Sequence, residues 1–362
     1  MAAATRPRRL RHGPRRRARG VKRRRESARR DSHDTATLTP IQVRTIHGIV
    51  NLFETGSILG DYGQVTLIPG DSGHLTFGRS QATLGSGGLS LLLDQYCGSA
   101  GARFGSLLAP YLDGIAARDV SLDSNLALHN ILRATADDPV MRGTQDGFFD
   151  AGFFQPALRE ARDFGIIDPL GCAIVYDSFV HGSWETIRDR VEGQPRTRGQ
   201  RPWLIDYVAV RREWLATHPR VDLRATVYRM DAIGRLIELD AWALELPLVV
   251  RGVEISMATL AGAPPGSFDD PEPGTRDLAF VPSGPLCRGV DVRLVQVALS
   301  QRGHDIHADG VFGRASAKTV AEFQDREGRA ATGVVEKALV TKLAAEVLPV
   351  VRSTARRRRP KS

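Results

Sequence analysis

A segment rich in proline, glycine and acidic residues, AGAPPGSFDDPEPGT at residues 261–275, divides this chain of 362 residues into two unequal parts. Such a composition is typical of a linker, because it offers few apolar side chains to a core and favours turns. We therefore predict a folded domain over residues 37–260, a linker over residues 261–283 and a small domain over residues 284–346.

The basic residues are concentrated at the two ends, where we predict an Arg-rich tail over residues 1–36 and a basic tail over residues 347–362. Residues 1–36 and 352–362 hold 20 of the 50 Lys and Arg residues but only 3 of the 41 acidic ones. Residues 37–351 therefore carry 30 bases and 38 acids, a net charge of −8. An acidic folded region favours a cationic substrate, although the same charge also suits an ordinary soluble surface. The N-terminal tail has too few apolar residues to fold and would bind anionic polymers without specificity, so we expect no specific nucleic acid partner.

Several function classes are disfavoured by what the sequence lacks. It has no run of 18 apolar residues, so no membrane span is predicted. It has no metal-ligand cluster, phosphate-binding glycine loop or nucleotide fingerprint, so we expect neither a metal nor a cofactor. No apolar stretch follows the N-terminal arginines, and we recognise no secretory signal. Cys97, Cys172 and Cys287 are widely spaced and are predicted to be free thiols, with a bridge between the first two left open.

The first predicted helix has signals at both ends. In TLTPIQVRTIHGIVNLFETG, Thr39, Pro40 and Gln42 have the spacing of an N-cap, a first helical residue and a capping-box partner. Apolar residues then recur at intervals of three and four from Val43 onward, and Gly56 ends the pattern. The sequence therefore predicts a capped helix with one apolar stripe.

The rest of the chain is predicted to be mainly α. After the first helix, YGQVTLIPGDSGHLTFG contains two short β-prone runs around a Pro-Gly-Asp turn, which predicts a small β-hairpin region. From Leu89 to about Leu215 the apolar spacing is mainly helical. The segment that follows the linker has the pattern of a small three-helix module.

Glu54 is the first candidate catalytic residue. It lies four residues after Val50 and therefore on the apolar stripe of the helix. It also lies in the last turn, where unpaired carbonyl groups carry partial negative charge. Desolvation and the helix dipole both disfavour a carboxylate, so we predict that Glu54 keeps its proton, as a general acid requires. The alternative is a structural ion pair between Glu54 and a nearby base.

Asp71 is the second candidate catalytic residue. Its turn, PGDSG, is polar, so we expect an ionised carboxylate, although Asp is common in turns for structural reasons alone. The hydroxyl of Thr76 can hold a water beside Asp71. An unequal pair of carboxyls is what hydrolysis of a glycosidic bond needs. A pair roughly 6.5–9.5 Å apart would invert the anomeric centre and a pair about 5 Å apart would retain it, and the sequence leaves both open.

These residues resemble the chitosanases of glycoside hydrolase family 46, over roughly residues 40–258. NLFETG followed by Tyr62, Asp71 and Thr76 is similar to that family's acid, tyrosine, base and water-positioning threonine. GSGGLSLLLDQY, YDSFVHG, YVAVRREWL and LELPLVVRGVEI recur there in similar form and order. The resemblance implies a two-lobed, lysozyme-like α+β fold with a cleft between the lobes. It also implies an inverting reaction with Glu54 as the acid and Asp71 as the base, and Tyr62 as a substrate-binding residue.

The chain departs from the family pattern around the cleft. Thr55 stands where the family usually has an acid or an amide. Gly73 and His74 stand where Arg or Asp, and then Gly or Pro, are usual. Gly88 replaces a sugar-binding Asp, and Asp94, six residues later, is our candidate for that substrate-binding role. The hydrolytic residues therefore match the family pattern, whereas residues expected to select glucosamine units depart from it.

A later helix predicts a buried ion pair. Leu204, Val208 and Leu215 share one helix face with Arg211, so the guanidinium is expected to be at least partly buried. A buried guanidinium needs a carboxylate, and Asp177 in LGCAIVYDSF is the best candidate. The family resemblance also implies an Asp–Arg network behind the catalytic Glu. The alternative is a salt bridge that serves only the fold.

The segment ADGVFGRASAKTVAEFQ, which begins at Ala308, resembles the short helical peptidoglycan-binding domain found beside many wall hydrolases. Its DGxFG turn, its FQ helix end and the later TGVV turn carry the resemblance. Peptidoglycan is therefore the expected partner of this module, which would raise the local substrate concentration by tethering.

We weigh three functions, all for a chain that we expect to be a monomer. The first is a chitosanase-type hydrolase that cuts β-1,4-linked glucosamine polymers, and the acidic body and the motifs favour it. The second is a peptidoglycan hydrolase, muramidase-like, of the same fold. The third is a non-catalytic protein that binds the cell wall or nucleic acid through its basic tails. An extracellular or cell-wall location is expected from the first two functions.

Overall fold

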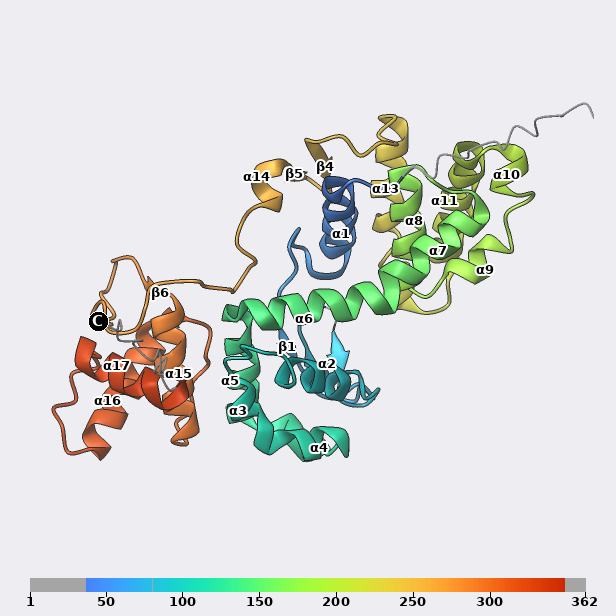
Figure 1. Ribbon diagram of the computed structural model, residues 1–362. Coiled ribbons are helices and arrows are strands. Elements are labelled where there is room, and N and C mark those ends of the chain that lie inside the picture. Colours follow the sequence, from blue (N-terminus) through green and yellow to red (C-terminus); the bar gives the residue numbers. More distant parts are fainter. Residues whose placement is uncertain (1–36, 80, 349–362) are drawn as a thin grey trace, which may run out of the picture. The chain divides into compact units, whose positions relative to one another are not determined.

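The structure, a computed structural model, describes residues 37–79 and 81–348 (Figure 1). The tail predicted at residues 1–36 lies outside the described residues, as does the tail predicted at residues 347–362 from residue 349 onward. Within the described part, no helix has the length and apolar character needed to cross a membrane. The three cysteines are free thiols, as predicted.

Helix α1 (Pro40–Thr55) has the predicted caps. The Thr39 hydroxyl accepts the Gln42 backbone N–H at 3.3 Å, and the Gln42 side chain accepts the Thr39 N–H at 2.9 Å. Gly56 ends the helix with a φ of 73°, a left-handed conformation that glycine adopts at little cost. These local signals fix both ends of the helix that carries Glu54.

Helix α1 packs into a first hydrophobic core, together with elements that follow residue 154. Helix α1 lies against α8, α8 against α7, and α11 against both α8 and α13 (Figure 1). These elements are α7 (Gln155–Phe164), α8 (Pro169–Val180), α9 (Trp184–Arg188), α10 (Pro195–Arg198), α11 (Gln200–Thr217), α12 (Val221–Arg224), α13 (Tyr228–Glu238), β4 (Leu248–Val250), β5 (Val253–Ile255) and α14 (Met257–Leu260). Burying an apolar side chain stabilises the fold by about 1.5–3 kcal/mol, so this core holds the lobe together.

A second core contains a small antiparallel sheet and further helices. Strands β1 (Val65–Thr66), β2 (Thr76–Phe77) and β3 (Ala82–Thr83) pair in that order, with Thr66 opposite Thr76 and Thr76 opposite Thr83. The helices are α2 (Gly88–Cys97), α3 (Gly105–Leu108), η1 (Ala109–Tyr111), α4 (Leu112–Ala116), η2 (Val120–Ser124), α5 (Leu126–Ala134) and η3 (Thr135–Asp137). The predicted β-hairpin is therefore present, with β3 as a further strand.

Helix α6 (Pro139–Phe149) contributes to both cores, because Met141 packs in the second core and Phe149 in the first. A π-helical turn, η4 (Asp150–Phe154), joins it to α7. The chain therefore has two lobes that share one helix, in agreement with the predicted two-lobed, mainly α fold.

The C-terminal module contains helices α15 (Val290–Gln301), α16 (Arg314–Arg326) and α17 (Lys337–Val347), with the strand pair β6 (Cys287–Arg288) and β7 (Val311–Phe312). Leu278, inside the predicted linker, is buried and pairs with Val335 of the module. The later part of that segment is therefore packed, although its composition is that of a linker.

Helix α15 of the module packs against α5 of the second lobe. The Arg293 guanidinium lies 2.9 Å from the Asp137 carboxylate, and both side chains are buried. Asn130 on α5 donates to the Ser300 hydroxyl at 2.8 Å and to the Ile306 carbonyl at 2.7 Å. Removing a partner from a buried polar contact costs about 1–3 kcal/mol, so these contacts favour a docked module over a freely tethered one.

Candidate active site

Glu54 lies in the last turn of α1, and its side chain is 27% exposed. Its Oε1 atom lies 2.8 Å from Nη2 of Arg229, a residue of α13 that is distant in sequence. The neighbouring residues Leu52 and Phe53 are buried in the first core. The structure therefore places Glu54 at the edge of an apolar core with a cation beside it, and the ion pair is the alternative that the sequence left open.

Arg229 belongs to a network of buried charges. Its Nη1 lies 2.9 Å from Asp177 Oδ1, and Nη1 of Arg211 lies 2.6 Å from Asp177 Oδ2. Asp177 and Arg211 are fully buried, and the Ser178 hydroxyl accepts a further hydrogen bond from Arg211 at 2.9 Å. The ion pair between Asp177 and Arg211 that helix periodicity predicted is thus present. It reaches Glu54 through Arg229.

Electrostatic interactions within this network keep Asp177 and Arg229 charged. Burial alone would raise the pKa of Asp177, but the nearby Arg211 and Arg229 outweigh burial and hold that pKa below its ordinary value. Burial likewise opposes the charge on Arg229, yet Asp177 and Glu54 outweigh it and raise the pKa of the guanidinium. A permanently charged Arg229 therefore contacts the candidate acid.

Arg229 was missed by sequence reasoning, although a signal for it exists. Ile233 and Leu236, four and seven residues later, are buried on the same helix face. The same periodicity argument that identified Arg211 would therefore have placed Arg229 in the core.

Asp71 lies in the exposed loop that joins β1 to β2. The loop turns tightly, because the Asp71 N–H donates to the Ile68 carbonyl at 3.0 Å. A cavity of about 540 Å³ opens here, lined by Asp71, His74 and Asp123 among others. Asp71 is thus solvent-accessible, in agreement with the polar turn predicted from the sequence.

Thr76 is the first residue of β2 and is half-buried. Its hydroxyl donates to the His74 carbonyl at 3.1 Å. His74 and Leu75 bind Asp123 of η2, through the imidazole Nδ1 at 2.8 Å and the backbone N–H at 2.9 Å. Neither His74 nor Asp123 was among the candidate residues from the sequence.

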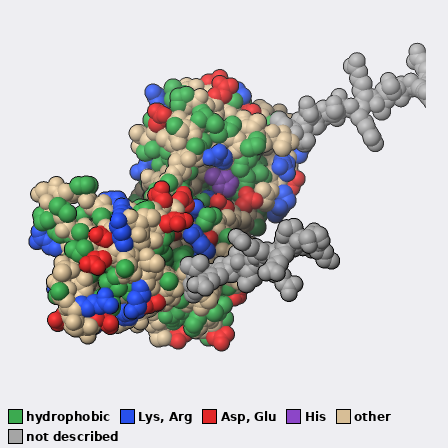
Figure 2. Space-filling view, turned by 60° about the vertical axis from the view of Figure 1, so that its left-hand side comes forward, with side chains coloured by type: hydrophobic (Ala, Val, Ile, Leu, Met, Phe, Trp, Pro, Cys, Tyr) green, Lys and Arg blue, Asp and Glu red, His purple; other side chains and the backbone are tan. Residues whose placement is uncertain are grey.

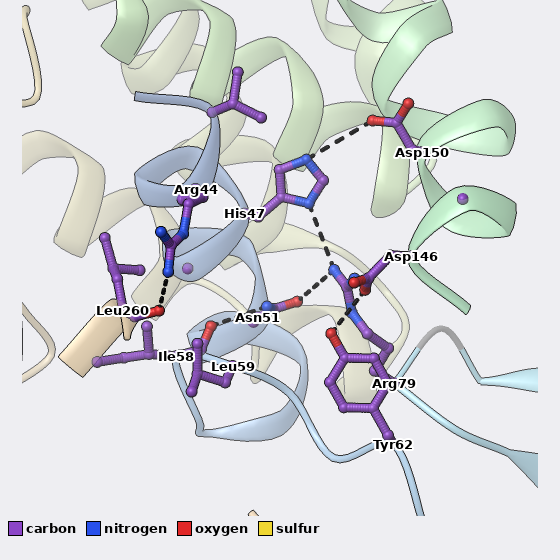
Figure 3. A pocket seen from close by; sticks show the side chains of 13 residues that line it. Arg44, His47, Asn51, Ile58, Leu59, Tyr62, Arg79, Asp146, Asp150 and Leu260 are labelled. Carbon is purple, nitrogen blue, oxygen red and sulfur yellow. Dashed lines mark hydrogen bonds and ion pairs between the residues drawn. The ribbon is translucent and has the colours of Figure 1, made fainter. Parts of the chain in front are cut away.

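A separate cavity of about 510 Å³ lies along α1, which lines it from Val43 to Asn51 (Figure 3). Arg79 points into the centre of this site and contacts groups from two helices. It pairs with Asp146 of α6, and its Nη2 donates to the Asn51 side chain of α1 at 3.3 Å. The Arg79 backbone N–H donates to the Gln145 side chain at 3.0 Å. Arg79 thus ties the sheet of the second lobe to α1 and α6.

His47 on α1 faces the same cavity, between Arg79 and Asp150 (Figure 3). Burial, helped by the charge of Arg79, lowers the pKa of His47 to about 3. The imidazole is therefore neutral near pH 7 and makes no full ion pair with Asp150, whose Oδ1 lies 4.0 Å away. Side chains of the same kinds, acidic, basic and histidine, gather in a hollow on the face shown in Figure 2.

The two candidate substrate-binding residues have different settings. Tyr62 is buried and donates its hydroxyl to Asp146 at 2.7 Å (Figure 3). Burial raises the pKa of that hydroxyl, so it stays a neutral donor. Asp94 is exposed on α2 and accepts from Ser90 at 3.4 Å. The neighbouring Gln95 lines a cavity with Gly88, the position where the sequence suggested a missing Asp.

The structure thus connects some candidate residues and not others. Glu54, Asp177 and Arg211 are linked through Arg229. Asp71 lies in the loop before β2, and Thr76, the first residue of β2, bonds to His74 of that loop. Within residues 37–79 and 81–348, no group of three or more His, Cys, Asp and Glu side chains is arranged to hold a metal ion. The two candidate catalytic carboxyls therefore lie in unlike surroundings, with Glu54 packed beside a cation and Asp71 exposed to solvent.

The sequence of this chain matches two family models. Residues 48–248 match glycosyl hydrolase family 46, and residues 288–343 match a peptidoglycan binding domain. The chain is also 25% identical, over 236 residues, to a chitosanase of Bacillus subtilis strain 168, an alignment that covers 60% of this chain and 85% of that protein.

Solved structures show the same fold. A mutant chitosanase from Bacillus subtilis MY002 superposes with a TM-score of 0.52 at 22% identity, and covers 59% of this chain and 96% of its own. A family 46 chitosanase from Gynuella sunshinyii superposes with a TM-score of 0.51 at 22% identity, and covers 61% of this chain and 99% of its own. Since the family match spans more than half of the chain, this protein belongs to glycosyl hydrolase family 46 and is a glycoside hydrolase with a peptidoglycan-binding type of domain on its C-terminal side.

Proposed function

We propose that this protein is an inverting endo-hydrolase of chitosan, a β-1,4-linked glucosamine polymer. The observation that carries the proposal is the family 46 match over residues 48–248, which includes Glu54, Asp71 and Thr76. The chitosanase relative supports the choice of polymer. The net charge of −8 over residues 37–351 supports a cationic substrate, because a negative surface raises the local concentration of a polycation.

In the proposed reaction, Glu54 protonates the oxygen of the leaving sugar as the bond from that oxygen to the anomeric carbon breaks. Asp71 accepts a proton from a water molecule, whose oxygen attacks the anomeric carbon from the opposite face. Arg229 engages Glu54 Oε1, so we assign the proton to Oε2, which can then face the sugar. Asp177 and Arg211 hold Arg229 in place from behind, and Thr76 holds the water.

The ion pair has a consequence for the acid. A guanidinium beside a carboxyl favours its charged form, whereas a general acid must carry a proton when the bond breaks. Asp177 also binds Arg229 and therefore draws part of that positive charge away from Glu54. We propose that this shared arginine holds the Glu54 carboxyl in place beside the sugar.

The test is release of reducing ends from soluble chitosan by the full chain. Glu54→Gln should lower the rate by about 10²–10⁴-fold, the contribution of a general acid. The matched control is Glu238→Gln, because Glu238 also ends a helix with an arginine at 2.8 Å but is exposed. The control should keep full activity, and an active Glu54→Gln would refute the assignment.

A second candidate substrate, peptidoglycan, is favoured by the match of residues 288–343 to a peptidoglycan binding domain. The same assay with purified peptidoglycan sacculi decides between the two. Reducing ends from sacculi but not from chitosan, lost in Glu54→Gln, would replace the proposed substrate and leave the proposed acid in place.

A further inference from the structure

The loop that carries Asp71 is held at one end by a single carboxylate. Oδ2 of Asp123 lies 2.8 Å from Nδ1 of His74, and Oδ1 accepts the Leu75 N–H at 2.9 Å. The two carboxylate oxygens therefore bind two successive residues, His74 and Leu75, which lie between Asp71 and Thr76 in the sequence. Asp123 itself is fixed in η2, whose first turn is capped by the Asp119 side chain at the Ser121 N–H.

His74 has an unusual backbone for its residue type. Its φ is 55°, in the left-handed region that residues other than glycine seldom adopt. This is one of the positions where the chain departs from the family pattern, which usually has Gly or Pro. A disfavoured conformation persists only where surrounding contacts over-determine it, and the two bonds to Asp123 supply those contacts.

The conformation of His74 decides where the Thr76 hydroxyl points. That hydroxyl donates its one hydrogen to the His74 carbonyl at 3.1 Å, so its lone pairs are left to accept. A water between the two residues can then donate one hydrogen to Thr76 and the other to Asp71. Both lone pairs of the water oxygen then stay free, and one of them can attack the anomeric carbon. If the hydroxyl instead donated to the water, one of the two lone pairs would be engaged and fewer orientations of the water would allow the attack.

We propose that Asp123 and His74 are positioning residues, a clamp that orients the Thr76 hydroxyl and thereby the attacking water. The inference rests on the proposed function, because it takes Asp71 as the base. It adds two residues of this chain that bind neither sugar nor water directly but hold the groups that do. The clamp acts on the rate of the chemical step and leaves substrate binding nearly unchanged.

The experiment measures kcat and KM on a glucosamine hexamer for His74→Ala, His74→Asn and Asp123→Asn. His74→Ala removes the donor to Asp123, and Asp123→Asn weakens the clamp from the other side. Each should lower kcat by about 10- to 100-fold, the loss expected when a reacting group shifts by about 1 Å, with KM changed less than about twofold. Asn tolerates a positive φ and can donate to Asp123, so His74→Asn should recover most of the kcat.

Two features make the result decisive. The His74 and Asp123 side chains are 37% and 30% exposed, so the variants should fold, and circular dichroism checks this. Asp113→Asn, an exposed carboxylate on α4 of the same lobe, is the control and should match the wild type. Asp71→Asn is measured alongside and should be inactive. If it is, unchanged kcat in His74→Ala and Asp123→Asn, or a raised KM with unchanged kcat, would overturn the clamp. An active Asp71→Asn would instead overturn the proposed base, and the clamp with it.

Discussion

The two carboxyls of the proposed reaction are held in opposite ways. Glu54 lies in the last turn of a helix of the first core and is tied through Arg229 to the buried Asp177, whereas Asp71 lies in an exposed loop anchored by Asp123. Removing one member of a buried ion network costs far more stability than changing a solvated loop. The position of the proposed acid is therefore built into the fold, and that of the proposed base depends on a few surface contacts.

The largest effect is expected when Asp177, the centre of the buried network, is replaced. Asp177→Ala leaves the guanidiniums of Arg211 and Arg229 buried without their shared partner, and should lower the free energy of unfolding by about 3–5 kcal/mol. Urea unfolding measures the change. Glu238→Ala breaks an exposed pair with Arg235 and should cost less than about 1 kcal/mol. Equal losses in the two variants would show that the network does not support the fold.

Acid pH should lower the stability that the buried network around Asp177 contributes. The pKa of Asp177 is held below its ordinary value of 3.8 in the folded protein, so the folded state binds fewer protons here than the unfolded state. Its contribution to stability is therefore complete above about pH 5 and is lost as the pH falls below that ordinary value. The stability gap between wild type and Asp177→Asn, followed by urea unfolding from pH 7 to pH 3, should narrow only at the acid end. A gap that widens toward low pH would contradict the assignment.

The loop half should show the reverse pattern, with activity lost and stability kept. Thr76→Val removes the hydroxyl without changing the shape of the side chain, and should lower kcat by about 10- to 100-fold, or about 1.4–2.7 kcal/mol in the activation barrier. The free energy of unfolding should change by less than about 0.5 kcal/mol. Thr66→Val, on the strand opposite, is the matched control and should keep its kcat. Equal kcat values for the two variants would remove Thr76 from the mechanism.

The smallest effect is expected at Asp94. This residue is exposed on α2, and we propose that it contacts a glucosamine unit by charge alone. Asp94→Asn should raise KM for soluble chitosan by about 2- to 5-fold at low salt, with kcat unchanged, because an exposed pair contributes at most about 1 kcal/mol. Added salt should erase the difference by screening. An identical KM at low salt would exclude Asp94 from substrate binding.

Local signals predicted much of this structure. The caps at Thr39 and Gly56 fixed both ends of α1, and helix periodicity found the ion pair of Arg211 with Asp177. Both rest on residues close in sequence or on the period of one helix. The predicted two-lobed, mainly α fold with a small helical module is confirmed as well.

The contacts that complete the site could not be predicted in the same way. Arg229 meets Glu54, and Asp123 meets His74, across segments that no local pattern connects. Leu278 makes the same point, because composition alone places it in a linker while its packing against Val335 comes from the tertiary fold. Sequence patterns report which face of an element is buried, and they leave open what that face will contact.

The anomeric configuration of the first sugar end released tests the proposed inverting mechanism, in which Glu54 is the acid and Asp71 the base. Proton NMR of glucosamine oligomers during early hydrolysis distinguishes the two anomers before they interconvert. A water activated by Asp71 on the face opposite Glu54 converts a β-linkage into an α-anomer, so the account predicts that the α-anomer appears first. If the β-anomer appeared first, the reaction would retain configuration, and the division of roles between Glu54 and Asp71 would be wrong.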